Sequence, residues 1–283
     1  SSSPLASLQE AISRTEGNDR NIIILQSDID VPDTILFYYN NIITIQSDGG
    51  DWKITPTDEA IIYGLFYIHN GTLTLGGGSG ESTLSIQDID TRFSLIQNDV
   101  GGTLIFKEGF EVSNAKMNYL VDNEGTFIIN GGSYYNNNIN GNITMTGGSI
   151  RDNYSLESEY STIIRNVNGA NVHINGGSII NNQMYGIVND ASLSFSSGSI
   201  TNNETDIIIE SLGNLTISGD AIVNTINMMS GNSIHIASDL ACDNIKVRLG
   251  GYSAGKEILK GSSSVLKANY ERFELDNTNY RIN

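Results

Sequence analysis

The chain has 283 residues, with 30 glycines, only 3 prolines and a formal net charge of −17. This composition favours many short strands and tight polar turns over helices. The acidity argues against a nucleic-acid partner, because neutralising phosphates requires clustered Lys and Arg, and it makes polyuronates poor ligands unless divalent cations bridge to them.

The first 17 residues carry a pattern typical of an amphipathic helix. Leu5, Leu8 and Ile12 fall on one helical face, which predicts a helix over residues 4–16 that ends at Gly17. A stack of parallel strands leaves an unpaired edge at its end. We therefore expect residues 1–17 to form a helical cap.

Residues 18–240 contain a repeated strand pattern. Segments such as "GTLTLG" from Gly71, "GTFIIN" from Gly125 and "GNLTIS" from Gly213 alternate apolar and polar residues with period two. Because successive side chains of a strand point to opposite faces, the apolar positions are predicted to face a core. These positions are Leu73, Leu75, Leu104, Phe106, Phe127, Ile129, Ile143, Met145, Val172, Ile174, Leu193, Phe195, Leu215 and Ile217.

The spacing of these strands predicts a solenoid. The first apolar residue recurs at intervals of 31, 23, 16, 29, 21 and 22 residues, and "NGGSIINN" and its copies follow several of the strands as glycine and asparagine corners. A third apolar segment, such as "GIVND" or "TIIRN", completes each unit. Three short strands in a coil of about 20 residues predict an all-β, right-handed parallel β-helix.

An antiparallel fold is the alternative. Asn-Gly pairs begin at positions 70, 130, 140, 168 and 175, and Asn-Gly is the strongest local signal for two-residue hairpins. A meander of hairpins does not require the same residue type at the same phase of each repeat, whereas a solenoid does. The parallel arrangement is therefore favoured.

The repeat fades after "NSIHIASDL", and residues 241–283 carry many of the cationic side chains. We interpret this segment as a β closing module. The predicted organisation is a cap at 1–17, a solenoid at 18–240 and a closing module at 241–283.

The chain resembles a known group of proteins. The run "SLQEAI", "NIIILQSDIDV", "IITIQSDGGDWKIT" and "LFYIHNGTLTLG", with the Gly-Gly-Ser coils and the ending "FELDNTNYRIN", is similar to adhesin-like β-helix regions of cell-surface proteins from Gram-positive bacteria, notably gut Firmicutes. The resemblance implies an extracellular, wall-attached location and a role in adhesion or glycan contact. It supplies no residue-by-residue functional assignments.

Parallel β-helices also host lyases and glycosidases, so an enzyme is an open alternative. A uronate lyase requires a basic residue, and Arg151 and Arg165 are the only cations between Lys116 and Lys246. Glycosidases require two carboxylates, but the polar face of the main strands carries none. The histidines, His69, His173 and His235, are far apart in sequence, and we expect no orienting carboxylate beside them.

Calcium is the one metal that the sequence suggests. Asp28, Asp30 and Asp33 lie near a predicted turn, and Asp48 and Asp51 flank two glycines. Carboxylate oxygens in such turns suit calcium, although neither segment matches a known calcium motif. We expect either no cofactor or calcium held by Asp28, Asp30, Asp48 and Asp51.

Carbohydrate binding requires aromatic platforms beside polar partners. The candidate platforms are Tyr134, Tyr135, Tyr154, Tyr160 and Tyr185, which stacked coils could align on one side. The alternative is a structural role, in which these tyrosines cover apolar surface at the corners.

The sequence thus predicts a non-enzymatic, adhesin-like extracellular module that contacts glycans or host surface proteins. Its alternatives are a polysaccharide-active enzyme, a calcium-assisted carbohydrate-binding module and a structural spacer. We expect a monomer within a larger multidomain chain, with no nucleic-acid partner. No run of 18 apolar residues is present, so no membrane insertion is expected.

Overall fold

The computed structural model describes residues 7–15, 19–57, 64–78, 80–91, 93–115, 117, 119–135, 139–154, 162–167, 169–229 and 231–282, without the side chains of 139–142. The protein is all-β, and the chain divides into two compact units, residues 1–142 and 143–283. Every strand pairing identified in the described ranges is parallel, so the hairpin alternative is wrong for these strands.

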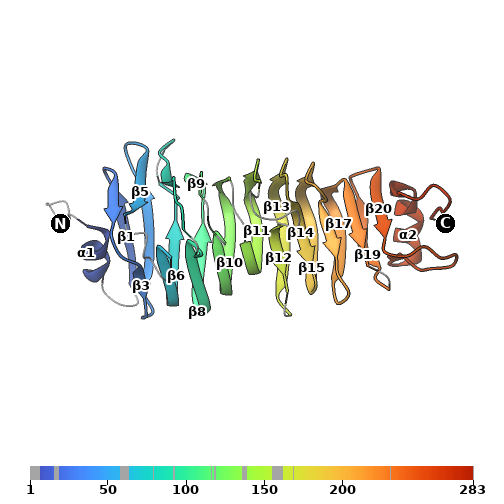
Figure 1. Ribbon diagram of the computed structural model, residues 1–283, viewed down its shortest axis with the longest axis horizontal. Helices are drawn as coiled ribbons and strands as arrows, with labels where there is room; N and C mark the ends of the chain where they lie inside the picture. Colours follow the sequence, from blue (N-terminus) through green and yellow to red (C-terminus); the bar gives the residue numbers. More distant parts are fainter. Residues whose placement is uncertain are drawn as a thin grey trace. The chain divides into compact units, whose positions relative to one another are not determined.

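The first unit contains one helix followed by strands that pair in a fixed order (Figure 1). The elements are α1 (Leu8–Ser13), β1 (Arg20–Leu25), β2 (Ile29–Val31), β3 (Ile35–Phe37), β4 (Ile42–Ser47), β5 (Trp52–Pro56), β6 (Phe66–Leu75), β7 (Leu84–Gln87), β8 (Ile96–Phe106), β9 (Phe110–Ser113) and β10 (Val121–Tyr134). Strand β1 pairs with β4, β2 with β5, and β3 with the beginning of β6. Each strand thus lies beside the equivalent strand of the next repeat.

The second unit repeats this parallel pairing. Its elements are β11 (Ile139–Arg151), which begins just before the unit boundary, β12 (Thr162–Asn166), β13 (Asn171–Ile180), β14 (Tyr185–Asn189), β15 (Ser192–Thr201), β16 (Ile207–Ile209), β17 (Asn214–Val223), β18 (Thr225–Met228), β19 (Ile234–Leu240), β20 (Ile245–Leu249), β21 (Leu259–Lys260), α2 (Ser263–Asn269), the 3-10 helix η1 (Tyr270–Arg272) and β22 (Phe273–Leu275). Strands β11, β13, β15, β17 and β19 form one parallel series. Strands β12, β14, β16, β18 and β20 form another.

The apolar positions predicted from the alternating pattern face the core. All fourteen are at most 1% exposed. The strand register also reproduces the predicted alignment within each unit: Leu73 lies opposite Leu104, Val172 opposite Leu193, and Leu193 opposite Leu215. Side chains of like character therefore pack on their counterparts one repeat away, and this parallel arrangement is compatible with a β-helix.

The Gly-Gly-Ser corners lie inside long strands and do not separate them. Strand β13 continues through the corner, and its register against β15 shifts there. Gly177 has a φ of +77°, and a Cβ at this position would lie 2.6 Å from the carbonyl oxygen of Gly147 in the adjacent repeat. Glycine is required because any other residue would collide with the neighbouring backbone.

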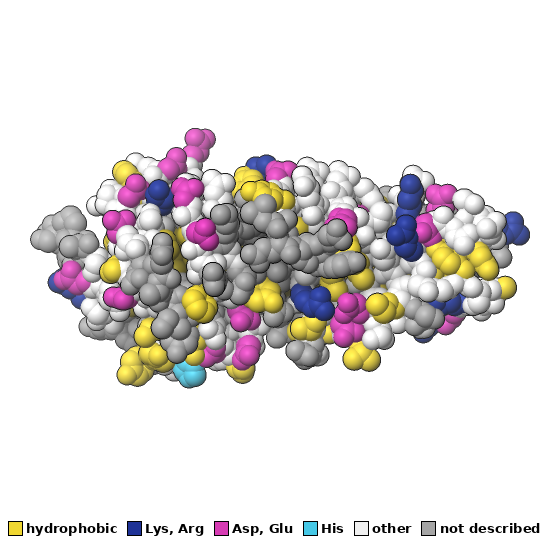
Figure 2. All heavy atoms as spheres, viewed as in Figure 1, with side chains coloured by type: hydrophobic (Ala, Val, Ile, Leu, Met, Phe, Trp, Pro, Cys, Tyr) yellow, Lys and Arg dark blue, Asp and Glu magenta, His cyan; other side chains and the backbone are white. Residues whose placement is uncertain are grey.

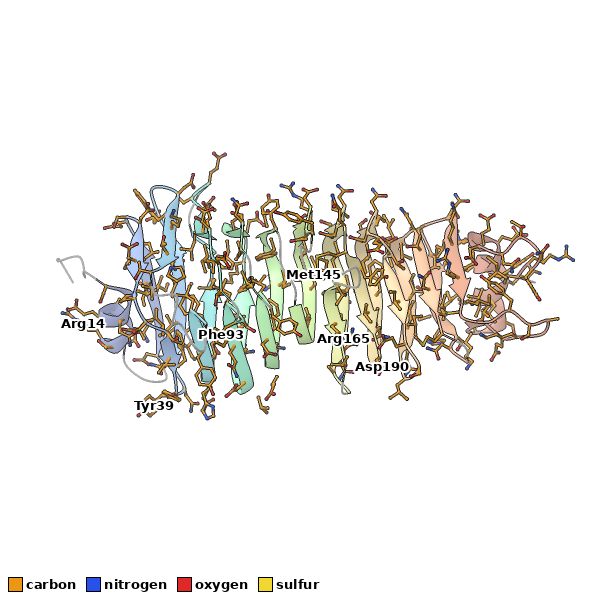
Figure 3. All side chains as sticks on the ribbon, in the orientation of Figure 1. Arg14, Tyr39, Phe93, Met145, Arg165 and Asp190 are labelled. Carbon is orange, nitrogen blue, oxygen red and sulfur yellow. The ribbon has the colours of Figure 1, made fainter. Side chains whose placement is uncertain are left out.

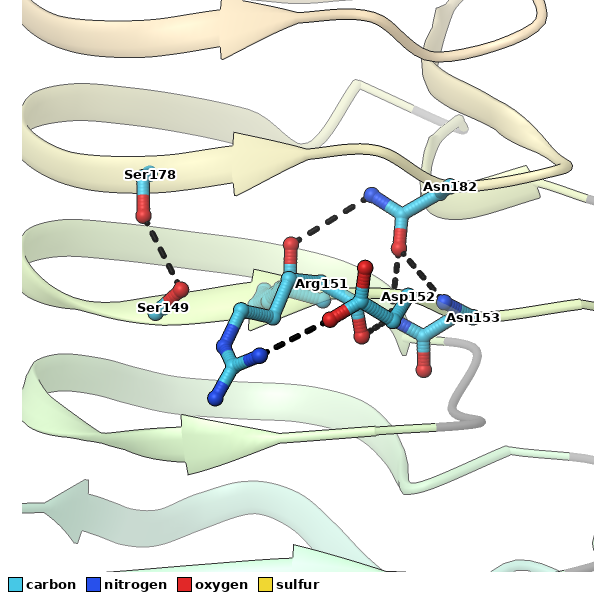
Figure 4. Close-up of polar contacts among 7 residues, drawn as sticks. Ser149, Arg151, Asp152, Asn153, Ser178 and Asn182 are labelled. Carbon is cyan, nitrogen blue, oxygen red and sulfur yellow. Dashed lines mark hydrogen bonds and ion pairs between the residues drawn. The ribbon is translucent and has the colours of Figure 1, made fainter.

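The asparagine corners form hydrogen-bonded columns in the second unit (Figure 4). Asn181 and Asn202 adopt the left-handed conformation, with φ of 58° and 57°. The next residue points inward: Asn153 Nδ2 donates to Asn182 Oδ1 (2.6 Å), and Asn182 Nδ2 donates to Asn203 Oδ1 (2.6 Å). Asparagine suits both roles, because it tolerates the left-handed region and its amide both donates and accepts.

Helical segments occur near both ends of the described chain. Helix α1 begins at Ser7, whose hydroxyl accepts a hydrogen bond from Glu10 N (3.1 Å), and it buries Leu8 and Ile12. The predicted boundary residues Leu5 and Gly17 lie outside the described residues.

The C-terminal segment differs in content from the predicted β module. Strands β21 and β22 still pair in parallel with β19 and β20, but α2 and η1 stand between them. Residues 263–269 lie within the predicted β module but form helix α2. Ser262 caps α2 by accepting from Val265 N (3.4 Å), and buried Asn269 binds Leu240 N (2.9 Å), which ties the helix to β19.

Candidate functional site

The sequence-predicted tyrosines do not form one platform. Tyr134 is fully buried: its ring lies 5.2 Å from that of Phe106, and its hydroxyl donates to the Gly131 carbonyl (2.6 Å). Burial, aided by the charge of Glu108, raises the pKa of Tyr134 well above its usual value. A side chain in this position packs the core and cannot stack on a sugar, so the prediction for Tyr134 is corrected.

The other predicted tyrosines are distributed over both units. Tyr135 is half-buried in the first unit, whereas Tyr185 is half-buried and Tyr154 is 49% exposed in the second. Tyr160 lies outside the described residues. Among these positions, Tyr154 has the most accessible ring, and a ligand role for these residues stays a prediction.

The predicted calcium residues connect neighbouring repeats. Asp28 Oδ1 accepts from Lys53 N (2.9 Å) and Asp51 Oδ1 accepts from Thr83 N (2.8 Å), while Asp30 is exposed and Asp48 is half-buried. Within the described ranges, no group of three or more His, Cys, Asp or Glu side chains could hold a metal ion. Asp28 and Asp51 each accept a hydrogen bond from a backbone N–H of a neighbouring repeat, as carboxylates that fix loops do.

The structure instead brings together Tyr38, Tyr67, His69 and Asp99, which we call the Tyr–His–Asp cluster. The ring centroids of Tyr38 and Tyr67 lie 6.1 Å apart, those of Tyr38 and His69 6.0 Å, and those of Tyr67 and His69 6.3 Å. The Tyr67 hydroxyl donates to Asp99 Oδ2 (2.7 Å), which also lies 2.9 Å from His69 Nδ1. Three rings and one carboxylate thus form a continuous contact network.

The parallel register explains how residues 30 or so apart meet. Phe37 lies opposite Ile68 on β6, and Ile68 lies opposite Asn98 on β8. The residues that follow them are Tyr38, His69 and Asp99, each of which comes directly after a buried position. The cluster is therefore a column across three successive repeats, at the point where the third strand segment leaves the core.

Two backbone features fix this corner. Gly71 has a φ of +93°, and a Cβ there would lie 2.7 Å from the carbonyl oxygen of Tyr39. Just before Asp99, the buried Asn98 side chain donates to Asn123 Oδ1 (2.6 Å) and to the Thr126 carbonyl (3.0 Å). Position 71 therefore requires a glycine. The hydrogen bonds of Asn98 fix the backbone from which the Asp99 side chain leaves the core.

The charge around the cluster is negative. Asp122 lies opposite Gln97 on the next repeat, and Glu124 follows Asn123 as Asp99 follows Asn98. In the part of the chain that the structure describes, no Lys or Arg forms an ion pair with Asp99, Asp122 or Glu124. Both contacts of Asp99 fall on Oδ2, and no described residue bonds Oδ1. This oxygen remains an acceptor for a ligand.

Exposed apolar side chains adjoin the cluster in sequence. Figure 2 shows hydrophobic side chains beside a histidine on this part of the surface, and Figure 3 shows Tyr39 projecting from the ribbon. Tyr39 and Val100 are each 77% exposed, Tyr38 52%, Phe93 44% and Leu36 38%. Single exposed apolar residues are normal, whereas contiguous exposed apolar surface marks a contact site.

The cluster was not predicted from the sequence. The expectation that no carboxylate lies beside a histidine is wrong for His69, which contacts Asp99. The sequence contained the signal: aligning "LFYIHN" at 65–70 with "LIQNDV" at 95–100 by their apolar residues places residues 69 and 99 at the same corner. His69 and Asp99 are far apart in sequence, but they occupy equivalent positions in successive repeats.

The chemistry of the cluster favours binding over catalysis. Asp99 is the one hydrogen-bonding partner of His69 in the described ranges, and the His69 side chain is 56% exposed. A His–Asp pair orients an imidazole, but covalent catalysis also needs a nucleophile within hydrogen-bonding reach of it. Aromatic faces, a free carboxylate oxygen and an imidazole are the groups that recognise a ligand with both apolar and polar faces.

Comparisons of the chain with protein-family models, with curated proteins and with solved structures find no match. In the described part of the chain, no helix has the length and apolar character needed to span a membrane. The function is therefore inferred from the geometry of the Tyr–His–Asp cluster.

Proposed function

We propose that this protein is a non-enzymatic, adhesin-like module that contacts glycans through the Tyr–His–Asp cluster. The supporting scaffold is a right-handed parallel β-helix with coils of about 20 residues, with α1 as its N-terminal cap and residues 241–283 as its closing segment. In this proposal the module is extracellular, attached to a bacterial cell surface as part of a longer chain, and monomeric.

One observation carries the proposal: the exposed rings of Tyr38 and His69 and the half-buried ring of Tyr67 lie beside a carboxylate that keeps an acceptor oxygen for a ligand. Sugars present CH faces that pack on aromatic rings and hydroxyls that donate to carboxylates. Tyr38 is 52% exposed, so its ring adds little to the core and is accessible to a ligand.

A glycan array tests the proposal. We expect the intact chain to bind at least one class of glycan, and the double substitution Tyr38→Ala/Tyr67→Ala to weaken binding by about tenfold or more, which corresponds to the loss of about 1.4 kcal/mol. Tyr154→Ala is the matched control, because it removes an exposed tyrosine of the other unit. Equal losses from Tyr154→Ala would place the site at the sequence-predicted tyrosines instead.

Two further arms separate the remaining alternatives. A chelator arm tests calcium, because a metal at Asp28, Asp30, Asp48 and Asp51 would make binding depend on divalent cations. Release of reducing ends or unsaturated products from the bound glycan would establish an enzyme. Absence of binding to every glycan would contradict the proposal and favour a spacer.

A further inference from the structure

We propose that the glycan recognised by the Tyr–His–Asp cluster is cationic and carries free amino groups, as in polymers of glucosamine. This inference rests on the proposed function and adds the chemical class of the ligand. It follows from the charge at the site, which neither uronate-containing nor neutral glycans complement.

Three carboxylates lie at the cluster and at the neighbouring corner. Asp99 has one oxygen that no described residue engages, and Asp122 and Glu124 occupy the neighbouring corner of the next repeat. No Lys or Arg of the described ranges neutralises these three groups. An ammonium group supplies the missing positive charge, and its hydrogen bonds to carboxylates are stronger than those of a neutral hydroxyl.

The second step concerns the rings. Tyr38, Tyr67 and His69 provide π-faces within one contact network. A protonated amine is attracted to aromatic faces, and a pyranose ring packs on the same faces through its CH groups. An amino sugar therefore uses the rings and the carboxylates together.

The third step concerns the surrounding field. Residues 1–142 contain 18 acidic and 6 basic side chains, a formal charge of 6 − 18 = −12, whereas residues 143–283 contain 14 and 9, a charge of −5. The cluster lies in the more acidic unit. This field attracts cationic ligands and repels uronates.

The test uses three trisaccharides with the same β-1,4 backbone, built from glucosamine, N-acetylglucosamine or glucose. Their affinities for the intact chain are measured by calorimetry at a pH where the amines are protonated. We expect the glucosamine trisaccharide to bind about tenfold or more tightly than the other two, as for one charge-assisted contact. The preference should shrink as salt rises and disappear when the pH is raised to deprotonate the amines.

Charge-matched variants locate the effect. Asp99→Asn and Glu124→Gln should each reduce the preference for glucosamine by several-fold, whereas Glu81→Gln should not, because Glu81 is an exposed acid of the same unit away from the cluster column. Equal losses in all three variants would show general attraction to an acidic protein and would overturn the inference.

The remaining outcomes separate the two proposals. Tighter or equal binding of the acetylated or glucose trisaccharide overturns the inference and leaves glycan binding intact. Failure of all three to bind, while the array shows another glycan, likewise overturns only the inference. Failure of both experiments overturns the proposed function as well.

Discussion

The Tyr–His–Asp cluster of the first unit and the asparagine column of the second both arise from the parallel pairing of successive repeats. In each, residues one repeat apart contact one another at a corner between strands: Asp99 contacts His69, 30 residues away, and Asn182 contacts Asn153, 29 residues away. The outcome differs. Asn153 and Asn182 are at most 3% exposed, and their amides bond each other (Figure 4). In the cluster, Tyr38 and His69 are exposed, the Asp99 side chain is 20% exposed, and no described residue bonds Asp99 Oδ1.

This difference separates a structural column from a functional one. A buried amide must be hydrogen-bonded, because an unsatisfied polar group in the core costs free energy. The Asp99 side chain is 20% exposed, so its carboxylate is partly solvated and can exchange water for a ligand. Saturation of hydrogen bonds, together with burial, therefore distinguishes the two columns better than residue type does.

The largest expected effect comes from breaking the asparagine column. Asn182→Ala removes the oxygen that accepts from Asn153 Nδ2. It also removes the amide nitrogen that donates to Asn203 Oδ1 and to the Ile150 carbonyl. We expect the free energy of unfolding of the second unit to fall by about 3 kcal/mol, since each buried group left unsatisfied costs about 1–3 kcal/mol. Urea denaturation measures the change.

The matched control is Asn175→Ala, which removes an exposed asparagine whose Oδ1 accepts from the Ser196 hydroxyl (2.8 Å). Its cost should stay below about 0.5 kcal/mol. Similar costs for the two variants would show that the buried column does not stabilise the fold.

The next effect is a pH dependence at the end of the same column. Asp206 is 1% exposed, and burial raises its pKa above the ordinary 3.8, although hydrogen bonds from Asn203, Thr225 and Asn224 oppose the shift. Because the folded state holds this proton more tightly, the contribution of Asp206 to stability is present below pH 3.8 and is lost as pH rises through the folded pKa.

The measurement is the free energy of unfolding of the natural chain minus that of Asp206→Asn, from pH 3 to pH 7. The difference should decrease with rising pH, and the other carboxylates cancel because both proteins contain them. An increase with pH would mean that the hydrogen bonds from the backbone outweigh the cost of burying the charge.

The smallest expected change in stability comes from replacing a tyrosine by phenylalanine, and it should differ between Tyr134 and Tyr67. Tyr134→Phe removes a buried hydrogen bond to Gly131 and should cost about 1 kcal/mol of stability without changing glycan binding. Tyr67→Phe removes the bond to Asp99 at the surface and should cost less than about 0.5 kcal/mol while changing glycan affinity. Thermal unfolding and binding titration of both variants check this prediction, which the reverse pattern would contradict.

The fold was largely predictable because the same alternating pattern recurs in each repeat. Alternating residues such as Leu73 and Phe127 gave the inward face, and the intervals between them gave the register, which the pairing of Leu73 with Leu104 and Leu104 with Phe127 confirms. Helix α2 was not predicted, because residues 263–269 carry no clear apolar periodicity and the helix is fixed by Asn269 and its contacts with β19.

The candidate site was harder to predict, because exposure and contact depend on the exact exit of each residue from a strand. Tyr134 and Tyr38 are the same residue type near a corner, yet the first points into a core beside Phe106 and the second to solvent. Alternation identifies the parity of a residue within a strand, but it does not apply at corners, where the backbone turns.

The sequence by itself determined the all-β class, the parallel repeat and the inward-facing residues, because burial of alternating apolar side chains is a local property that each repeat encodes. Only the tertiary structure decided which residues meet at the surface. Tyr38, His69 and Asp99 follow one another at intervals of about 30 residues, and their contact arises because parallel pairing places the corner of each repeat beside that of the next.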